Sequence, residues 1–529
     1  MTTRPGGSTQ SPLWWVPAYP PEIGGIETFA ATVAPALGRY RPDLLVSRGG
    51  PSDMVIDGVR VIRADLLTGP DDSDAQRLFE RRRRVSQLKS ELRPSLYHLH
   101  LADANPLLHL STLSAAPAPT VTTVHNETHG QGAGAQGRAK VMRRLMEAST
   151  IITAVSPTVG RRLATEHLDL AHRFVTIPNG IDSGPDPSDI PPEPAILAVG
   201  RLTEQKGFDR LIAAMPDIVA MRPDATLTIV GSGPDADGLH SQIAGLGLEQ
   251  HVRIVGGVQR EAVAAIMSKA RVIVTPSRWE GLCLVAVEAG AAGRPVVATD
   301  VAGLDRLIET GANGFLVSND EAESTPNVLA KPVVELLNND NLATRMGATA
   351  RARAVHGYSL DACAHSYRTL YDALLRPAAD IAVILTSSGA TAQASSQVAS
   401  IRREAHGLGA SAQITVGHDG GPPLHPSTAS SGPDARHVIE FQQPSLGLAA
   451  ARNAGLALSS GELVVFGDLE VWSDRDLVRT LEQRRGAGRG GSSPNVRRRE
   501  EFEQIGGYDP FAFDPLADWL SRAEARPGR

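Results

Sequence analysis

The sequence predicts an α/β protein with two doubly wound parallel sheets, followed by a third and shorter α/β segment. Short apolar, β-branched runs alternate with helix-length amphipathic segments along most of the 529 residues, a pattern typical of parallel sheets covered by helices. A proline-rich polar break spans residues 181–195, and a new strand pattern starts after Arg376. A chain of this length also exceeds what one core supports. We therefore expect domains at residues 1–185, 186–377 and 378–529.

In the first domain, six apolar runs predict strands at residues 42–47, 59–64, 95–101, 120–126, 150–156 and 174–180. Helices are expected at residues 26–40, 81–92 and 138–148. In the second domain, strands are expected at residues 195–202, 226–231, 252–258, 271–276 and 295–299, and helices at 208–220, 260–270, 284–293 and 359–375. Two such domains facing each other leave a cleft at the carboxyl ends of their strands, where ligands of this architecture bind.

Composition and charge exclude several classes of protein. Hydrophobic residues make up 42 % and charged residues 21 % of the chain, as in ordinary globular proteins. A formal net charge of −6 argues against general nucleic-acid binding. Cys283 and Cys363 are the only cysteines and have no disulfide or metal-site spacing. The sequence has neither a signal-peptide pattern nor an apolar run of membrane-spanning length, so we expect a cytoplasmic protein, with a peripheral membrane contact left open.

Two basic residues follow the first strand of the second domain. This strand ends at Gly200, Arg201 comes next, and Lys206 with Gly207 precedes a helix. A guanidinium can bind two oxygens, an ammonium adds a point charge, and a helix N-terminus favours anions, so the loop suits a diphosphate. A solvated loop without a ligand is the alternative.

Two glutamates lie around the helix that follows residues 271–276. Glu280 stands in a glycine-containing turn, and Glu288 lies within an apolar helix, where an unsatisfied carboxylate is costly. Glu288 shares a helix face with Leu284 and can accept hydrogen bonds from vicinal hydroxyls such as those of a ribose. Glu280 and the backbone N–H groups of Gly281 and Leu282 could contact a sugar. The alternative is a surface glutamate and a second glutamate paired with an arginine.

Two further features mark the first domain. Gly24 and Gly25 precede a helix, and glycine there lets a backbone approach an anionic ligand closely. His125 stands at the carboxyl end of a strand that we expect to be buried. Both a plain turn and a structural histidine remain open as alternatives.

Together, these segments resemble the family 4 retaining glycosyltransferases of GT-B fold, over about residues 14–375. The motifs that carry the resemblance lie at residues 20–29, 123–126, 154–157, 177–182, 199–207, 227–234 and 276–299. The resemblance implies that Arg201 and Lys206 hold the donor diphosphate. It further implies that Glu288 binds the ribose, and that Glu280, Gly281 and Leu282 bind the sugar. In the first domain, Gly24 and Gly25 would lie beside a phosphate, and His125 would contact the transferring sugar. The sequence departs from the family pattern at Cys283 and Arg306.

The resemblance implies transfer of a sugar from a UDP- or GDP-sugar donor to an acceptor hydroxyl that the sequence does not identify. The anomeric configuration would be retained, in the biosynthesis of a glycan, a glycolipid or a small glycoside. No metal or other cofactor is expected for this unit, because Arg201 and Lys206 supply the positive charge. Two alternatives are a sugar-nucleotide epimerase on the same fold and a non-catalytic sugar-nucleotide-binding scaffold.

The third segment resembles the inverting family 2 glycosyltransferases of GT-A fold. In place of their Asp-x-Asp metal motif it has Asp468-Leu469-Glu470, and the first acidic position has Asp419 alone. Asp468 and Glu470 could still hold Mg²⁺ or Mn²⁺. The stretch between the motifs is short, and residues 484–499 are expected to be a glycine- and arginine-rich linker. We therefore expect a shortened, inactive GT-A-like domain.

Overall fold

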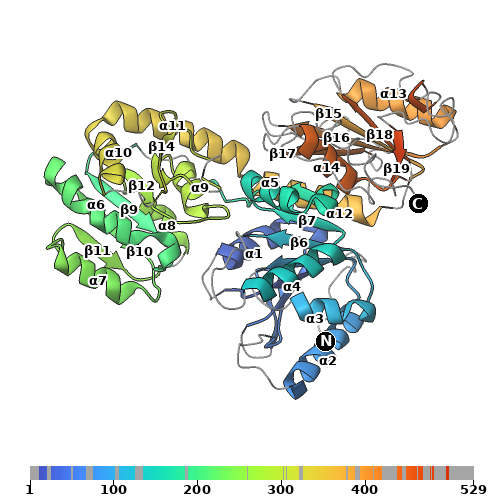
Figure 1. Ribbon diagram of the computed structural model, residues 1–529, viewed down its shortest axis with the longest axis horizontal. Helices are drawn as coiled ribbons and strands as arrows, with labels where there is room; N and C mark the ends of the chain where they lie inside the picture. The colour runs from blue at the N-terminus through green and yellow to red at the C-terminus, as the bar shows by residue number, and fades with distance from the viewer. Residues whose placement is uncertain are drawn as a thin grey trace. The chain divides into compact units, whose positions relative to one another are not determined.

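The chain forms two compact units in the computed structural model (Figure 1). The first unit comprises Met1–Ile177 with Asp361–Arg529, and the second comprises Pro178–Leu360. The structure describes residues 11–20, 25–48, 52–66, 75–101, 106–125, 135–184, 189–258, 260–301, 303–304, 307–320, 326–376, 379–387, 394–408, 410–419, 438–443, 448–461, 463–468, 477, 479–481 and 496–499.

The N-terminal part of the first unit contains an eight-stranded sheet of order β3-β4-β2-β1-β5-β6-β7-β8. All neighbouring strands run parallel except β3 and β4, which form a hairpin that the sequence patterns did not predict. Asp57 and Gly58 close this hairpin with φ of 50° and 76°, as a two-residue turn between twisted strands requires. The strands are Leu13–Val16 (β1), Asp43–Val46 (β2), Ser52–Ile56 (β3), Val59–Arg63 (β4), Tyr97–Leu101 (β5), Thr120–Val124 (β6), Ile151–Ala154 (β7) and Phe174–Thr176 (β8).

Helices cover this sheet, and one of them comes from much later in the chain. Helix α12 (Leu360–Leu375) follows the second unit in sequence, yet it packs on the first sheet. Its Tyr371 hydroxyl accepts a hydrogen bond from Trp14 Nε1 at 2.8 Å and lies 2.5 Å from His98 Nδ1, both in buried positions. The other helical segments are Gly25–Ala36 (α1), Gly38–Tyr40 (η1), Ala75–Leu92 (α2), Pro106–Ser111 (α3), Leu113–Ala115 (η2), Ala135–Ala148 (α4), Pro157–Glu166 (α5) and Leu168–Arg173 (η3).

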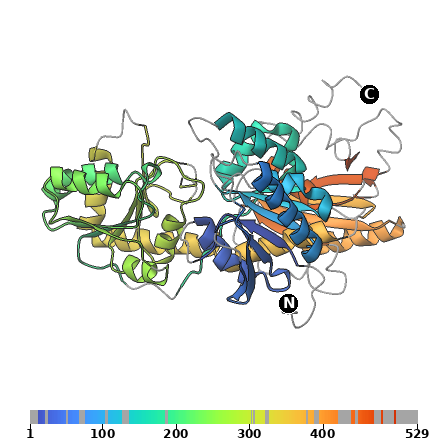
Figure 2. The same ribbon diagram turned by 90° about the horizontal axis from the view of Figure 1, so that it is seen from below.

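The second unit is a six-stranded, entirely parallel sheet of order β11-β10-β9-β12-β13-β14, with helices on both faces (Figure 2). Strand order reverses between β9 and β12, and in doubly wound sheets ligands bind outside the carboxyl ends of the strands at such a point. The strands are Ala195–Val199 (β9), Thr226–Val230 (β10), Val252–Val255 (β11), Val272–Thr275 (β12), Val296–Thr299 (β13) and Gly314–Val317 (β14). The helical segments are Glu204–Lys206 (η4), Phe208–Met221 (α6), Ala236–Gly245 (α7), Arg260–Met267 (α8), Leu284–Ala291 (α9), Pro326–Asn338 (α10) and Asp340–Gly357 (α11).

The C-terminal part of the first unit holds a five-stranded sheet of order β17-β16-β15-β18-β19. Its helix α14 packs against β8 and η3 of the N-terminal part. One expectation is wrong here: within the predicted linker, Val496–Arg498 form strand β19, because Val496 is apolar and only 2 % exposed in this core. The elements are Ile381–Ser387 (β15), Ala394–Gly407 (α13), Ala412–Asp419 (β16), Val438–Gln443 (β17), Leu448–Leu458 (α14), Leu463–Asp468 (β18) and Val496–Arg498 (β19).

None of the helices in the described part of the chain combines the length and the apolar character needed to cross a membrane.

Candidate active site

The loop that follows β9 is held by the loop that follows β10. A Cβ atom on Gly231 would lie 1.8 Å from the carbonyl oxygen of Gly200, so the two loops can approach this closely only because Gly231 has no side chain. The Leu202 N–H donates to the Ser232 carbonyl at 3.0 Å, and the Leu202 carbonyl accepts from Asp235 N–H at 3.1 Å. These contacts fix the backbone on both sides of Arg201.

The same loop is also attached to the loop that follows β12. Arg278 N–H donates to the Gln205 carbonyl at 2.8 Å, and Gln205 Nε2 donates to the Trp279 carbonyl at 3.0 Å. The Arg278 guanidinium donates to the Glu204 carbonyl at 2.9 Å and forms an ion pair with Asp209 at 2.7 Å. The loops after β9 and β12 therefore form one connected surface at the point where the strand order reverses.

Lys206 and Glu280 form an ion pair at this surface. Lys206 Nζ lies 2.5 Å from Glu280 Oε1, and Ser277 Oγ donates to the same oxygen at 2.7 Å. The Glu280 side chain is 4 % exposed and the Lys206 side chain 20 %. Burial lowers the pKa of Lys206, but attraction to Glu280 outweighs it and holds the pKa above its usual value. Lys206 is therefore a fixed cation.

Several hydrogen-bond donors and acceptors around this pair are unused in the described part of the chain. Within the described part of the chain, Glu280 Oε2 and the backbone N–H groups of Gly281 and Leu282 make no hydrogen bond. The exposed Arg201 guanidinium makes neither a hydrogen bond nor an ion pair there. One cation, one carboxylate oxygen and two backbone donors are thus available to a polar ligand.

Helix α9 carries the second glutamate. Glu288 is half-buried, one turn after Leu284. Cys283 stands at the N-cap position of this helix without a side-chain capping bond, and burial raises the pKa of its thiol to about 12, so it is protonated and not a nucleophile at neutral pH. The predicted residues Arg201, Lys206, Glu280, Gly281, Leu282 and Glu288 all lie on the loops and helix that follow β9 and β12 of the second unit.

His125 and Gly25 belong to the first unit. His125 follows β6, is 5 % exposed, and its Nε2 lies 3.0 Å from His100 Nδ1. Burial lowers the pKa of His125 to about 3, so its imidazole is neutral. Gly25 begins α1, and a Cβ atom there would meet nothing within 4 Å. Gly24 lies outside the described residues.

The predicted metal site of the third sheet is described only in part. Asp468 Oδ1 accepts hydrogen bonds from Thr386 Oγ1 at 3.2 Å and Arg452 Nη2 at 3.3 Å. Glu470 and Arg306 lie outside the described residues. Across the described ranges, no group of three or more His, Cys, Asp or Glu side chains is placed to hold a metal ion.

The sequence patterns missed three parts of this site: the pairing of Lys206 with Glu280, the supporting hydroxyl of Ser277, and His100 behind His125. Lys206 and Glu280 are 74 positions apart, and no local period links two such loops. The signal that could have paired them is the strand order, because loops after β9 and β12 meet only if these strands are neighbours.

The fold and the site define a class of protein with doubly wound domains and two cations after a strand end, one of them fixed by an ion pair, suited to an anionic ligand. Comparison with known protein families identifies the class more narrowly. The model of "Glycosyl transferases group 1" matches residues 185–353, and that of "Glycosyltransferase Family 4" matches residues 23–184. Neither match extends into the third sheet.

Curated relatives agree with this assignment. The phosphatidyl-myo-inositol mannosyltransferase of Mycobacterium leprae is 34 % identical over 290 residues, which are 52 % of this chain and 72 % of that protein. The alpha-D-kanosaminyltransferase of Streptomyces kanamyceticus is 33 % identical over 178 residues, 34 % of this chain and 45 % of that protein. The match thus spans less than half of the second relative. This chain belongs to the group 1, family 4 glycosyltransferases, and it is a glycosyltransferase.

Solved structures show the same fold. Sucrose-phosphate synthase from Thermosynechococcus elongatus superposes with a TM-score of 0.57 at 22 % identity, over 68 % of this chain and 98 % of that one. The Anabaena protein Alr3699/HepE, in complex with UDP and glucose, gives a TM-score of 0.56 at 21 % identity. This match covers 68 % of this chain and 98 % of that one. The predicted α/β, GT-B-like fold is therefore confirmed, while the GT-A likeness of the third sheet stays a prediction.

Proposed function

We propose that the chain transfers a sugar from a UDP- or GDP-sugar to an acceptor hydroxyl with retention of configuration, in glycan, glycolipid or small-glycoside biosynthesis. The observation that carries this proposal is the pair of cations in the loop after β9: Lys206 is fixed by Glu280, and Arg201 has no partner among the residues that the structure describes. The complex of Alr3699/HepE with UDP and glucose supports a nucleotide-linked donor, and the mannosyltransferase relative supports transfer of a sugar.

In this proposal, Arg201 and Lys206 bind the donor diphosphate. When the glycosidic bond to the diphosphate breaks, negative charge grows on the leaving oxygen, and a cation already held in place, as Lys206 is by Glu280, stabilises it without reorganisation. The Arg201 guanidinium can form bidentate hydrogen bonds with phosphate oxygens, and Lys206 supplies a point charge that Glu280 keeps in position.

The remaining groups position the sugar and the ribose. Glu280 Oε2 accepts a hydrogen bond from a sugar hydroxyl, and Glu288 accepts hydrogen bonds from the ribose hydroxyls. The backbone N–H groups of Gly281 and Leu282 donate hydrogen bonds to the sugar nucleotide. We keep Gly24 and Gly25 as phosphate-side residues and His125 as the group that contacts the transferring sugar. A neutral His125 adds no positive charge near an anomeric carbon that becomes electron-poor.

Arg201→Ala is the direct test of the diphosphate site. Loss of a hydrogen bond to a charged group should weaken UDP or GDP binding by about 1.5–3 kcal/mol. The free energy of unfolding should not change, because Arg201 is exposed and has no partner in the described structure. Isothermal titration calorimetry and urea denaturation measure the two quantities.

Arg253→Ala is the matched control for that variant. Arg253 is also an exposed arginine of the second unit, but it lies on β11 and donates to Thr228 Oγ1. It should bind UDP and GDP as the unmodified chain does. Equal binding by the Arg201 and Arg253 variants would contradict the diphosphate assignment.

We also expect sugar transfer to persist in EDTA. The protein's own cations neutralise the diphosphate in the second unit, so a divalent ion is not needed there. The measurement is the initial rate of product formation in excess EDTA against an untreated sample. Loss of the rate, restored by Mn²⁺, would instead assign the chemistry to Asp468 and Glu470 and to an active third domain.

A further inference from the structure

Two histidines of the first sheet meet across neighbouring strands. His100 lies on β5, and His125 directly follows β6. These strands are parallel, with His100 opposite Thr123, so His125, two residues further along, lies on the same face of the sheet as His100. His100 Nδ1 and His125 Nε2 are 3.0 Å apart. The same diagonal contact occurs one step earlier, where His98 Nε2 lies 2.6 Å from Thr123 Oγ1.

His100 is enclosed by aromatic rings. Its ring centroid lies 4.2 Å from that of His98, 4.5 Å from that of Trp14 and 5.3 Å from that of Phe29. Its side chain is 4 % exposed, and burial holds its pKa well below the usual value. The ring is therefore neutral and carries a single hydrogen. Within the described part of the chain, His100 Nε2 is buried and has no hydrogen-bond partner.

This unmatched nitrogen indicates where the hydrogen of His100 lies. A hydrogen on Nε2 would be a buried N–H without an acceptor, which is rarer in proteins than an acceptor without a donor. With the hydrogen on Nδ1, His100 donates to His125 Nε2, and only a lone pair is left unmatched. His125 is also neutral, since burial lowers its pKa to about 3. Because its Nε2 accepts, its own hydrogen lies on Nδ1.

The Nδ1 atom of His125 is open to a ligand. No described residue forms a hydrogen bond with it, and, in contrast to His100 Nε2, it is not fully buried. Phe29 packs edge-on against the His125 ring at a centroid distance of 5.3 Å and restricts its rotation. The accessible nitrogen of His125 is therefore the one that carries the hydrogen and can donate it.

We propose that His100 is a positioning residue for sugar transfer: it holds His125 in the tautomer that presents Nδ1–H to an oxygen of the transferring sugar. This inference rests on the proposed function, in which His125 contacts that sugar. The hydrogen bond at one ring nitrogen of a histidine decides whether the other nitrogen is a donor or an acceptor. His100 itself touches no substrate, because its free nitrogen is buried.

The first test is a nuclear magnetic resonance measurement on the full chain, with ¹⁵N-labelled histidine and without a sugar nucleotide. The ¹⁵N chemical shifts of an imidazole distinguish Nδ1–H from Nε2–H. The signals of His125, assigned by their loss in His125→Asn, should report Nδ1–H. His100→Asn should keep this tautomer, because its amide can donate in place of the ring. His100→Leu has nearly the same shape as His100→Asn but cannot donate, so it should shift His125 towards Nε2–H.

The second test is the rate of sugar transfer by the same variants. His100→Leu should lower kcat about tenfold to a hundredfold, comparable with the loss of a partner that orients a metal-binding histidine. His100→Asn should retain most of the rate. A purely structural role would lower the stability of both variants and leave the tautomer of His125 unchanged. If His100→Leu does not fold, the tautomer in the unmodified chain and the rate of His100→Asn decide.

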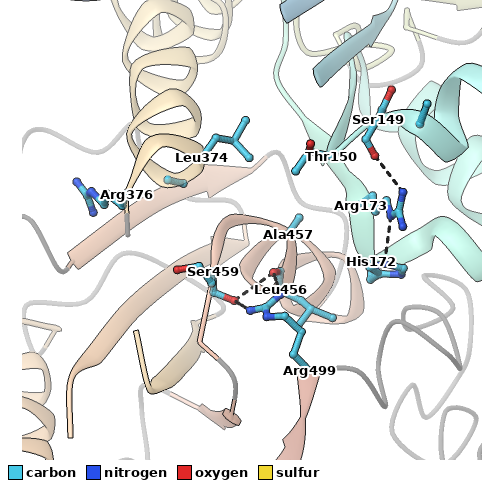
Figure 3. Close-up of a pocket in the computed structure, with 13 residues that line it drawn as sticks. Ser149, Thr150, His172, Arg173, Leu374, Arg376, Leu456, Ala457, Ser459 and Arg499 are labelled. Atoms are coloured by element: carbon cyan, nitrogen blue, oxygen red, sulfur yellow. Dashed lines mark hydrogen bonds between the residues drawn. The ribbon is translucent and has the colours of Figure 1, made fainter. Parts of the chain in front are cut away.

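His172→Leu is the matched control. His172 is another buried histidine of the first unit, and its Nε2 faces Arg173 Nε at 3.4 Å beside a different cavity (Figure 3). The lining of that cavity includes neither His100 nor His125. His172→Leu should therefore change neither the tautomer of His125 nor the transfer rate.

Two outcomes separate this proposal from the proposed function. If His125→Asn transfers sugar at the original rate, the sugar contact of His125 is refuted, and the role of His100 in transfer with it. If His125→Asn is inactive but the hydrogen of His125 lies on Nε2 in the unmodified chain, the role of His100 alone is overturned. Equal transfer rates of His100→Leu and His100→Asn would overturn it as well.

Discussion

Replacing Lys206 by alanine should lower the free energy of unfolding by about 3 kcal/mol and abolish sugar transfer. The variant leaves Glu280, which is 4 % exposed, without its cation, and removing one partner of a buried ion pair typically costs about 3–5 kcal/mol. Ser277 Oγ still donates to Glu280, so we expect the lower end of that range. Urea denaturation followed by circular dichroism measures the stability, and product formation from a sugar nucleotide measures transfer.

A double variant, Lys206→Met with Glu280→Gln, separates stability from catalysis. It removes both charges at similar side-chain volume, so most of the lost stability should return. Transfer and diphosphate binding should stay lost, because the fixed cation is gone. A double variant that transfers sugar at the original rate would show that Lys206 only supports the loop. A single variant as stable as the original chain would show that the pair contributes nothing to folding.

Gly207→Ala should destabilise the second unit by about 3 kcal/mol and sharply reduce transfer. Gly207 has φ of 64°, and a Cβ atom there would lie 2.1 Å from the Pro276 carbonyl oxygen. The left-handed conformation costs a residue with a side chain roughly 1–2 kcal/mol, and overpacking adds about 1–3 kcal/mol. The loops after β9 and β12 must then move apart, which displaces Lys206 from Glu280. Urea denaturation and the transfer rate measure both effects.

Gly238→Ala provides the matched comparison within the same unit. Gly238 lies inside α7, and a Cβ atom there would meet nothing within 4 Å. Alanine inside a helix is favoured over glycine by roughly 0.5–1 kcal/mol, so this variant should be slightly more stable and fully active. If Gly207→Ala behaved as mildly, the close approach of the two loops would not be required for the site.

The strands predicted from a continuous apolar run in the second unit are confirmed, whereas two of the strands that were not predicted, β3 and β19, depend on pairing. The runs at Val272–Thr275 and Val296–Thr299 are fully buried in a parallel sheet, and such strands are continuously apolar. Strand β3 was not predicted because it lies at the sheet edge, where the exposed fractions of Met54 and Val55 are 45 % and 66 %. Strand β19 was not predicted because its arginine-rich sequence contains a single buried valine. This stretch forms a strand only by pairing with β18.

The sequence by itself determined the parallel α/β layout and the placement of Arg201 and Lys206 between a strand and a helix. Both follow from local periodicity and from residue types at strand ends. Only the tertiary structure decided that Lys206 pairs with Glu280 across 74 positions and that α12 packs on the first sheet. The physical reason is that burial and the choice of polar partner depend on contacts between distant segments, which a linear pattern does not contain.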